Sequence, residues 1–109
     1  MRSGPVGRRF YRLVSAAEPP VHDFMPLAAS GRRFGDPDVQ RRAEEVSIWD
    51  SLEAAVKVRA RRPELRFIAV LEVPPNVALT RGRGGHWGIP RGKSAEEIRT
   101  WVIEVRAIT

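Results

Sequence analysis

The chain has 109 residues, a formal net charge of +6 and no cysteine, and 42% of its residues are hydrophobic. This length and apolar content suit a single domain with one core. The lack of cysteine excludes disulfides, thiolate zinc sites and cysteine nucleophiles. Because no apolar run approaches the ~18 residues of a membrane span, we expect a soluble, cytoplasmic protein without a membrane partner.

The first residues predict a flexible amino-terminal tail over 1–8, followed by one domain over 9–109. RFYRLV, residues 9–14, alternates as a strand, and Arg12 shares a face with apolar side chains. An arginine in this setting is costly unless its charge finds a partner, and its planar fork suits a phosphate or carboxylate. The alternative is an edge strand from which Arg12 faces water.

The other elements follow from periodicity, capping residues and turn residues. In chain order we expect helical turns within 21–31, a short helix from Asp36, a strand at 46–49, the main helix at about 50–62, strands at 66–73 and 77–81, a glycine-rich loop at 82–93, a short helix from Ser94 and a strand at 101–108. The strand at 66–73 is apolar on both faces, which predicts an interior position in the sheet. One main helix packed on a small, mostly antiparallel sheet is an α+β fold.

Ser47 and Trp49 share a face of the short strand 46–49, because side chains alternate along a strand. A hydroxyl beside a large flat ring suits a planar heterocycle, with the ring stacking and the hydroxyl holding a ribose or an amide. The alternative is that Trp49 belongs to the core and Ser47 is a small polar residue at its edge.

The segment TRGRGGHWGIPRGK, residues 80–93, combines five glycines with basic residues and His86, and it holds no acid. Glycines let a backbone approach an anion, and a histidine transfers protons near neutral pH. His86 is therefore a catalytic candidate. The basic side chains of this segment form an alternative nucleic-acid site: Arg81, Arg83, Arg91 and Lys93.

Positive charge alone does not identify a nucleic-acid surface here. Of the 19 basic residues, 17 are arginine, a preference that a GC-rich genome also imposes, and they are scattered along the whole chain. Two histidines without clustered acids predict no metal site.

Four segments together, RFYRLV, VSIWDSLEAAVKVRARRP, FIAVLEVP and GHWGIP, resemble small bacterial ADP-ribosyltransferase-like domains, with the RES-type NAD-handling toxins as the nearest comparison. The resemblance spans about residues 9–108. It implies the fold of that group, NAD as substrate, and a toxin or effector that cleaves the nicotinamide–ribose bond. It also implies a protein or nucleic-acid target and a cognate antitoxin as partners.

Carried over to this chain, the resemblance makes Arg12 the residue that holds the phosphates and ribose of NAD. Ser47 with Trp49 would cradle the nicotinamide ribose. The family's Q/E-x-E turn is missing, so Glu104, on the last expected strand, is the best-placed catalytic acid. Two alternatives remain open: a nucleic-acid-binding module that uses residues 81–93, and an interaction domain of the same fold without catalysis.

Overall fold

The computed structural model describes residues 8–31 and 35–108. The predicted tail lies outside these residues except for Arg8, which begins the first strand. The elements in chain order are β1 (Arg8–Val14), the 3₁₀ turns η1 (Val21–Phe24) and η2 (Leu27–Ser30), α1 (Pro37–Ala43), β2 (Val46–Trp49), α2 (Leu52–Lys57), the 3₁₀ turn η3 (Val58–Ala60), β3 (Phe67–Val73), β4 (Thr80–Arg81), β5 (His86–Ile89), α3 (Ala95–Arg99) and β6 (Val102–Ala107).

Each of the three α-helices in the described part of the chain begins at a side-chain cap. The carboxylate of Asp36 accepts hydrogen bonds from the first turn of α1, the hydroxyl of Ser51 accepts one from Ala54 N at 3.1 Å, and the hydroxyl of Ser94 accepts one from Glu97 N at 3.0 Å. These bonds satisfy amide groups that have no partner inside a helix. The predicted helix starts at Asp36 and Ser94 are therefore confirmed.

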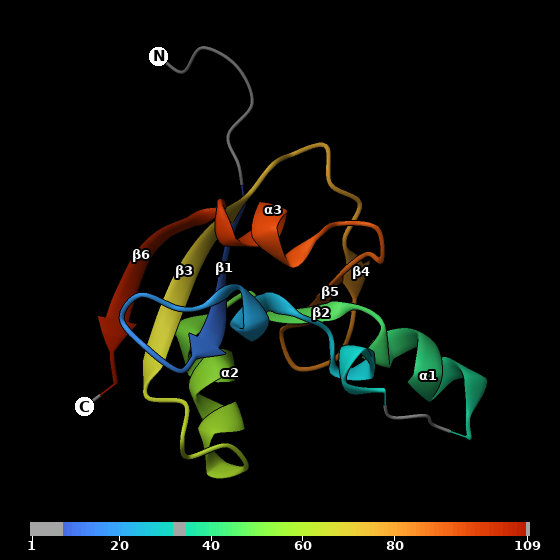
Figure 1. Cartoon of the computed structure of the whole chain (residues 1–109), viewed down its shortest axis with the longest axis horizontal. Helices are drawn as coiled ribbons and strands as arrows, with labels where there is room; N and C mark the ends of the chain where they lie inside the picture. Colours follow the sequence, from blue (N-terminus) through green and yellow to red (C-terminus); the bar gives the residue numbers. More distant parts are fainter. Residues whose placement is uncertain (1–7, 32–34, 109) are drawn as a thin grey trace.

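The strands form one six-stranded antiparallel sheet in the order β4-β5-β2-β1-β3-β6 (Figure 1). The predicted α+β class is confirmed, and β3 is an interior strand with residues 68–71 buried. β1 is interior as well, since it lies between β2 and β3. Arg12 therefore does not face water from an edge strand.

The two faces of the sheet are covered differently. One face, here called the core face, carries the main apolar cluster, to which η1 contributes Phe24 and α3 contributes Ile98. The opposite face is covered in part by α2, whose Ala55 is fully buried. Two large apolar side chains of this helix stay exposed, Leu52 at 40% and Val56 at 37%. The expected main helix is also shorter, because α2 gives way to the 3₁₀ turn η3 at Val58.

The segment expected as a glycine-rich loop is largely a hairpin. His86–Ile89 forms β5, which pairs with β2 on one side and with the two-residue β4 on the other. Gly84 and Gly85 make the turn with φ of 63° and 83°, a conformation that side chains rarely adopt. The carbonyl of Gly85 accepts a hydrogen bond from Asp50 N at 2.9 Å, which ties the turn to the start of α2. The hairpin therefore carries His86 to β2.

Candidate ligand pocket

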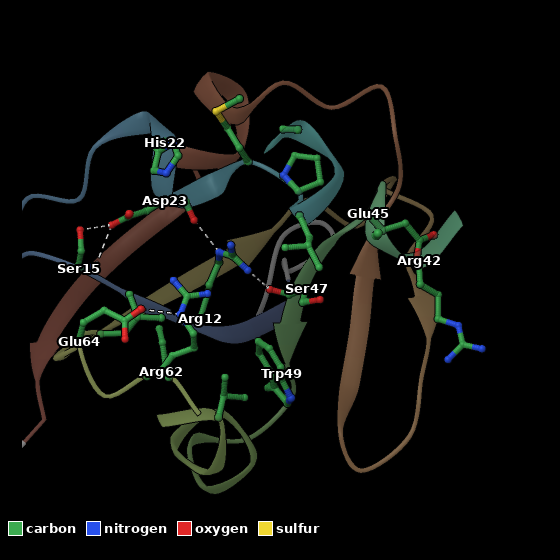
Figure 2. A pocket seen from close by; sticks show the side chains of 18 of the residues that line it. Arg12, Ser15, His22, Asp23, Arg42, Glu45, Ser47, Trp49, Arg62 and Glu64 are labelled. Atoms are coloured by element: carbon green, nitrogen blue, oxygen red, sulfur yellow. Dashed lines mark hydrogen bonds and ion pairs between the residues drawn. The ribbon is translucent and has the colours of Figure 1, made fainter. Parts of the chain in front are cut away.

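A pocket of about 950 Å³ opens beside β1 and β2, which pair at a single position, Tyr11 opposite Trp49. Both strands line it, together with η1, η2, α1 and residues 58–65 (Figure 2). Its charged lining residues are Arg12, Arg42, Arg62, Asp23, Glu45 and Glu64. Its apolar lining includes Met25, Leu27 and Val39, which are 40%, 54% and 42% exposed. The pocket therefore combines arginines with apolar surface still open to solvent.

Arg12 crosses from β1 to the two neighbouring walls of this pocket. Its Nε donates to the backbone carbonyl of Asp23 at 2.8 Å, and its Nη1 donates to the backbone carbonyl of Ser47 at 2.6 Å (Figure 2). Among the described residues no acceptor is placed on Nη2. Arg12 thus joins η1 to β2 through its Nε and Nη1 atoms.

Burial lowers the pKa of Arg12 to about 10, an effect that the charge of Asp23 opposes and the charge of Arg62 reinforces. The guanidinium is still protonated at neutral pH. It therefore keeps a positive charge in a partly dehydrated setting, where attraction to an anion is stronger than in water.

Strand alternation separates the Arg12 side chain from those of Ser47 and Trp49. Because Tyr11 is paired with Trp49, Tyr11 shares a face with Trp49 and Ser47, and Arg12 leaves the sheet on the core face. All three residues nevertheless line the same pocket. Arg12 meets Ser47 through the backbone carbonyl, so the Ser47 hydroxyl has a different partner.

That partner is His86 on β5. Its Nε2 lies 2.8 Å from the Ser47 hydroxyl, and its ring meets Trp49 edge-on with ring centres 5.4 Å apart. Burial lowers the pKa of His86 below its usual value; the charge of Glu45 opposes this shift, and that of Arg42 adds to it. A neutral His86 whose Nε2 accepts the Ser47 hydrogen leaves the hydroxyl oxygen free to accept a second bond.

Glu45 is a pocket residue that the sequence analysis missed. Its carboxylate accepts a hydrogen bond from the Thr80 hydroxyl at 2.9 Å, and a Cβ at Gly88 would collide with it. Glu45, just before β2, is two residues from Ser47, and Ser47 is two residues from Trp49. This spacing of two along the sequence predicts that the three side chains share one face of the strand. Glu45 therefore supplies a carboxylate beside the Ser47–His86 pair.

Glu104, the acid expected from the resemblance, lies elsewhere. It is on β6, and two strands, β3 and β1, separate β6 from β2. Its exposed carboxylate pairs with Arg106 at 2.6 Å, and that hydrogen bond lowers the pKa of Glu104. The structure thus brings Arg12, Ser47 and Trp49 to one pocket, with His86 behind Ser47, and leaves Glu104 at the far edge of the sheet.

The basic residues of segment 81–93 do not share one environment. Arg81 lies over the Trp87 ring at 5.5 Å, and the indole N–H donates to Asp50 at 3.1 Å. Arg91 pairs with Glu44 at 3.4 Å and Lys93 with Glu97 at 3.5 Å. Acids accompany two of the four residues proposed for nucleic-acid contact, while Arg83 is exposed in the turn. Nucleic-acid binding through this hairpin stays a prediction.

Comparisons of this chain with protein-family models, with curated proteins and with solved structures find no match. Within residues 8–31 and 35–108, no helix is both long and apolar enough to cross a membrane. The same described residues contain no group of three or more histidine, aspartate or glutamate side chains that could hold a metal ion. Interpretation of the pocket therefore rests on its own geometry.

We expect Arg12→Lys to lower the free energy of unfolding by about 2 kcal/mol, because an ammonium cannot reach both carbonyls that the planar guanidinium joins. Urea unfolding followed by tryptophan fluorescence measures the change. Arg61→Lys, at an exposed position, is the matched control and should stay within about 0.5 kcal/mol of the unsubstituted protein. Equal stability of the two variants would contradict the bridging role of Arg12.

The lowered pKa of His86 predicts a pH dependence of stability. Because the unfolded chain binds this proton more tightly than the folded one, the free energy of unfolding falls as the pH drops below the unfolded value of about 6.5, and the loss levels off below the folded pKa. Urea unfolding between about pH 5 and about pH 7.5 should show a weaker dependence in His86→Gln. His22 is present in both proteins and cancels in the difference. Identical pH profiles would show that His86 does not contribute.

Proposed function

We propose that this chain is an ADP-ribosyltransferase-like protein that binds NAD in the pocket beside β1 and β2. The observation that carries the proposal is the gathering of Arg12, Ser47 and Trp49 on the lining of one pocket. Its volume of about 950 Å³ is at the upper end of the usual range for small-molecule and cofactor sites. The ADP-ribosyltransferase-like fold is part of this proposal and is supported by the six-stranded antiparallel sheet.

Each part of NAD has a counterpart in the lining. The pyrophosphate would bind Nη2 of Arg12 and the guanidinium of Arg62, since arginine forks match phosphate oxygens. The indole of Trp49 offers a flat surface for the nicotinamide or the adenine. The apolar side chains of Met25 and Leu27 would cover the other ring. The lining carries three arginines and three carboxylates, so the preference for an anionic ligand with flat rings rests on the two arginines assigned to the pyrophosphate and on the indole.

Cleavage would break the bond between C1 of the ribose and the nicotinamide nitrogen. The bonding electron pair leaves with nicotinamide, and positive charge develops on the sugar as in glycoside cleavage. The Glu45 carboxylate would stabilise that charge, in place of the distant Glu104. The Ser47 oxygen, with its hydrogen donated to His86, would accept a bond from a ribose hydroxyl. Water or a nucleophile of a macromolecular target would then attack C1 and release its proton to solvent.

Ligand binding without catalysis is the second candidate. The Thr80 hydroxyl already donates to the Glu45 carboxylate at 2.9 Å, and a carboxylate engaged in this way is a weaker stabiliser of charge on a sugar. In that case the pocket would hold the dinucleotide intact. Measurements of binding and of turnover separate the two candidates.

We predict that NAD raises the thermal unfolding temperature, and that the rise continues with the logarithm of the NAD concentration above the dissociation constant, because NAD binds the folded chain alone. Arg62→Gln should weaken NAD binding about tenfold through loss of a charge-assisted contact, and Trp49→Leu should weaken it through loss of stacking. Calorimetric titration gives the dissociation constants. Arg91→Gln, outside the pocket, is the matched control for lost charge. Absence of any shift at about 5 mM NAD would refute the proposal.

For turnover, we predict that Glu45→Gln keeps NAD binding and reduces the release of nicotinamide by about a hundredfold or more, the scale of a lost electrostatic stabiliser. Chromatographic assay of free nicotinamide measures the rate. Glu53→Gln, an exposed acid on α2, is the control. Full activity in Glu45→Gln together with its loss in Glu104→Gln would contradict our assignment of the acid. No release by the unsubstituted protein, with NAD bound, would favour the binding-only candidate.

A further inference from the structure

The outer edge of β6 is open in the structure. β6 is the last strand of the sheet within the described residues, with β3 as its neighbour, and no other element lies beyond it at the left of Figure 1. On this strand Ile103 is 49% exposed. An open edge of this kind presents unpaired backbone groups that another strand can bind.

The register with β3 tells which backbone groups point outward. Ile108 N donates to Arg66 O at 2.9 Å, and bonding alternates along an antiparallel ladder, so the backbone groups of Arg106 and Glu104 also point toward β3. Those of Val105 and Ala107 then point away from the sheet. Val105, near the middle of β6, therefore presents both a donor and an acceptor at the open edge.

We infer that this edge binds a second copy of the chain, through β6 paired antiparallel with β6 about a two-fold axis at Val105. In this register Val105 of one copy exchanges both backbone hydrogen bonds with Val105 of the other. Glu104 lies opposite Arg106 of the second copy, and by symmetry Arg106 lies opposite Glu104. Two cross-strand ion pairs thus flank the axis on one face of the joined sheets.

The charges of Glu104 and Arg106 favour the register with the axis at Val105 over the registers shifted by one residue in either direction. A two-fold axis at Glu104 would place two glutamates opposite each other, and an axis at Arg106 would place two arginines opposite each other. Like charges directly opposite one another destabilise a strand pair. The exposed Ile103 lies at a bulge of β6, where the register with β3 shifts, and it stands outside the regular ladder of this pairing. The sequence VIEVRA is therefore complementary to itself in one arrangement.

Replacing the Glu104–Arg106 ion pair within one chain by ion pairs between two chains loses little of the stability of the single chain. The Glu104–Arg106 pair within one copy joins side chains that are 47% and 51% exposed, and exposed pairs of this kind contribute little to stability. Two chains of net charge +6 repel each other, and a pair of six-residue strands is a small interface. The dimer should therefore be weak, with a dissociation constant on the order of 100 μM.

The test is sedimentation equilibrium at chain concentrations from about 10 μM to about 1 mM, which bracket that constant. The unsubstituted protein should shift from monomer to dimer over this range. Glu104→Arg and Arg106→Glu each place like charges across the axis and should weaken the dimer about tenfold or more. The double variant Glu104→Arg/Arg106→Glu restores opposite charges and should dimerise as the unsubstituted protein does.

An equimolar mixture of the two single variants gives a second, independent reading. One strand then carries two arginines and the other two glutamates, so a heterodimer should form at about 100 μM, a concentration at which each variant alone is mostly monomeric. Circular dichroism checks that the exposed substitutions leave the fold intact. A monomer at about 1 mM, or a dimer that the single substitutions leave unchanged, would overturn the inference. Neither sedimentation result depends on whether the chain binds NAD, so the dimer and the NAD site are tested separately.

Discussion

The pocket depends on one guanidinium. Arg12 leaves an interior strand on the core face and donates to the backbone carbonyls of Asp23 and Ser47, which belong to segments far apart in the sequence. β1 and β2 share a single ladder pair, so these bonds replace part of the backbone pairing that would otherwise join the two strands. A charged group in this position is costly without acceptors. The same two bonds therefore stabilise the charge, hold η1 against the sheet and keep the pocket open between its walls.

The two faces of the sheet around this guanidinium differ in composition: one is apolar and the other carries polar side chains. The core face carries the apolar cluster that η1 and α3 complete. The opposite face carries a polar row from β2 and β5, in which Ser47 contacts His86 and Glu45 contacts Thr80 of β4. The β4–β5 hairpin is therefore part of the site, because it supplies the histidine and, at Gly88, the space that the Glu45 carboxylate occupies. The pocket spans this division, since Arg12 leaves β1 on the core face, Trp49 leaves β2 on the opposite face, and both line the pocket.

Local signals in the sequence were sufficient for much of the fold. The caps at Asp36 and Ser94 depend on neighbouring residues alone, and the doubly apolar run of β3 predicted its interior position correctly. The strand β5 was missed because its residues lie among glycines, and its pairing with β2 is a contact between segments about forty residues apart. The same limit affected the site. Alternation at 45, 47 and 49 could have identified Glu45, whereas the backbone acceptors of Arg12 and the position of Glu104 depend on strand order, which no local pattern encodes.

The acceptors that hold Arg12 are main-chain oxygens, and this has a consequence for how such a domain can diversify. Every amino acid carries the same carbonyl, so a different side chain at position 47 leaves this acceptor in place, whereas the Asp23 carboxylate also stabilises the Arg12 charge and accepts hydrogen bonds from Ser15. A change of the Ser47 hydroxyl would then alter the lining of the pocket while the backbone bond from Arg12 stays in place. The same residue thus supplies a backbone atom that fixes Arg12 and a side chain that can change independently of it.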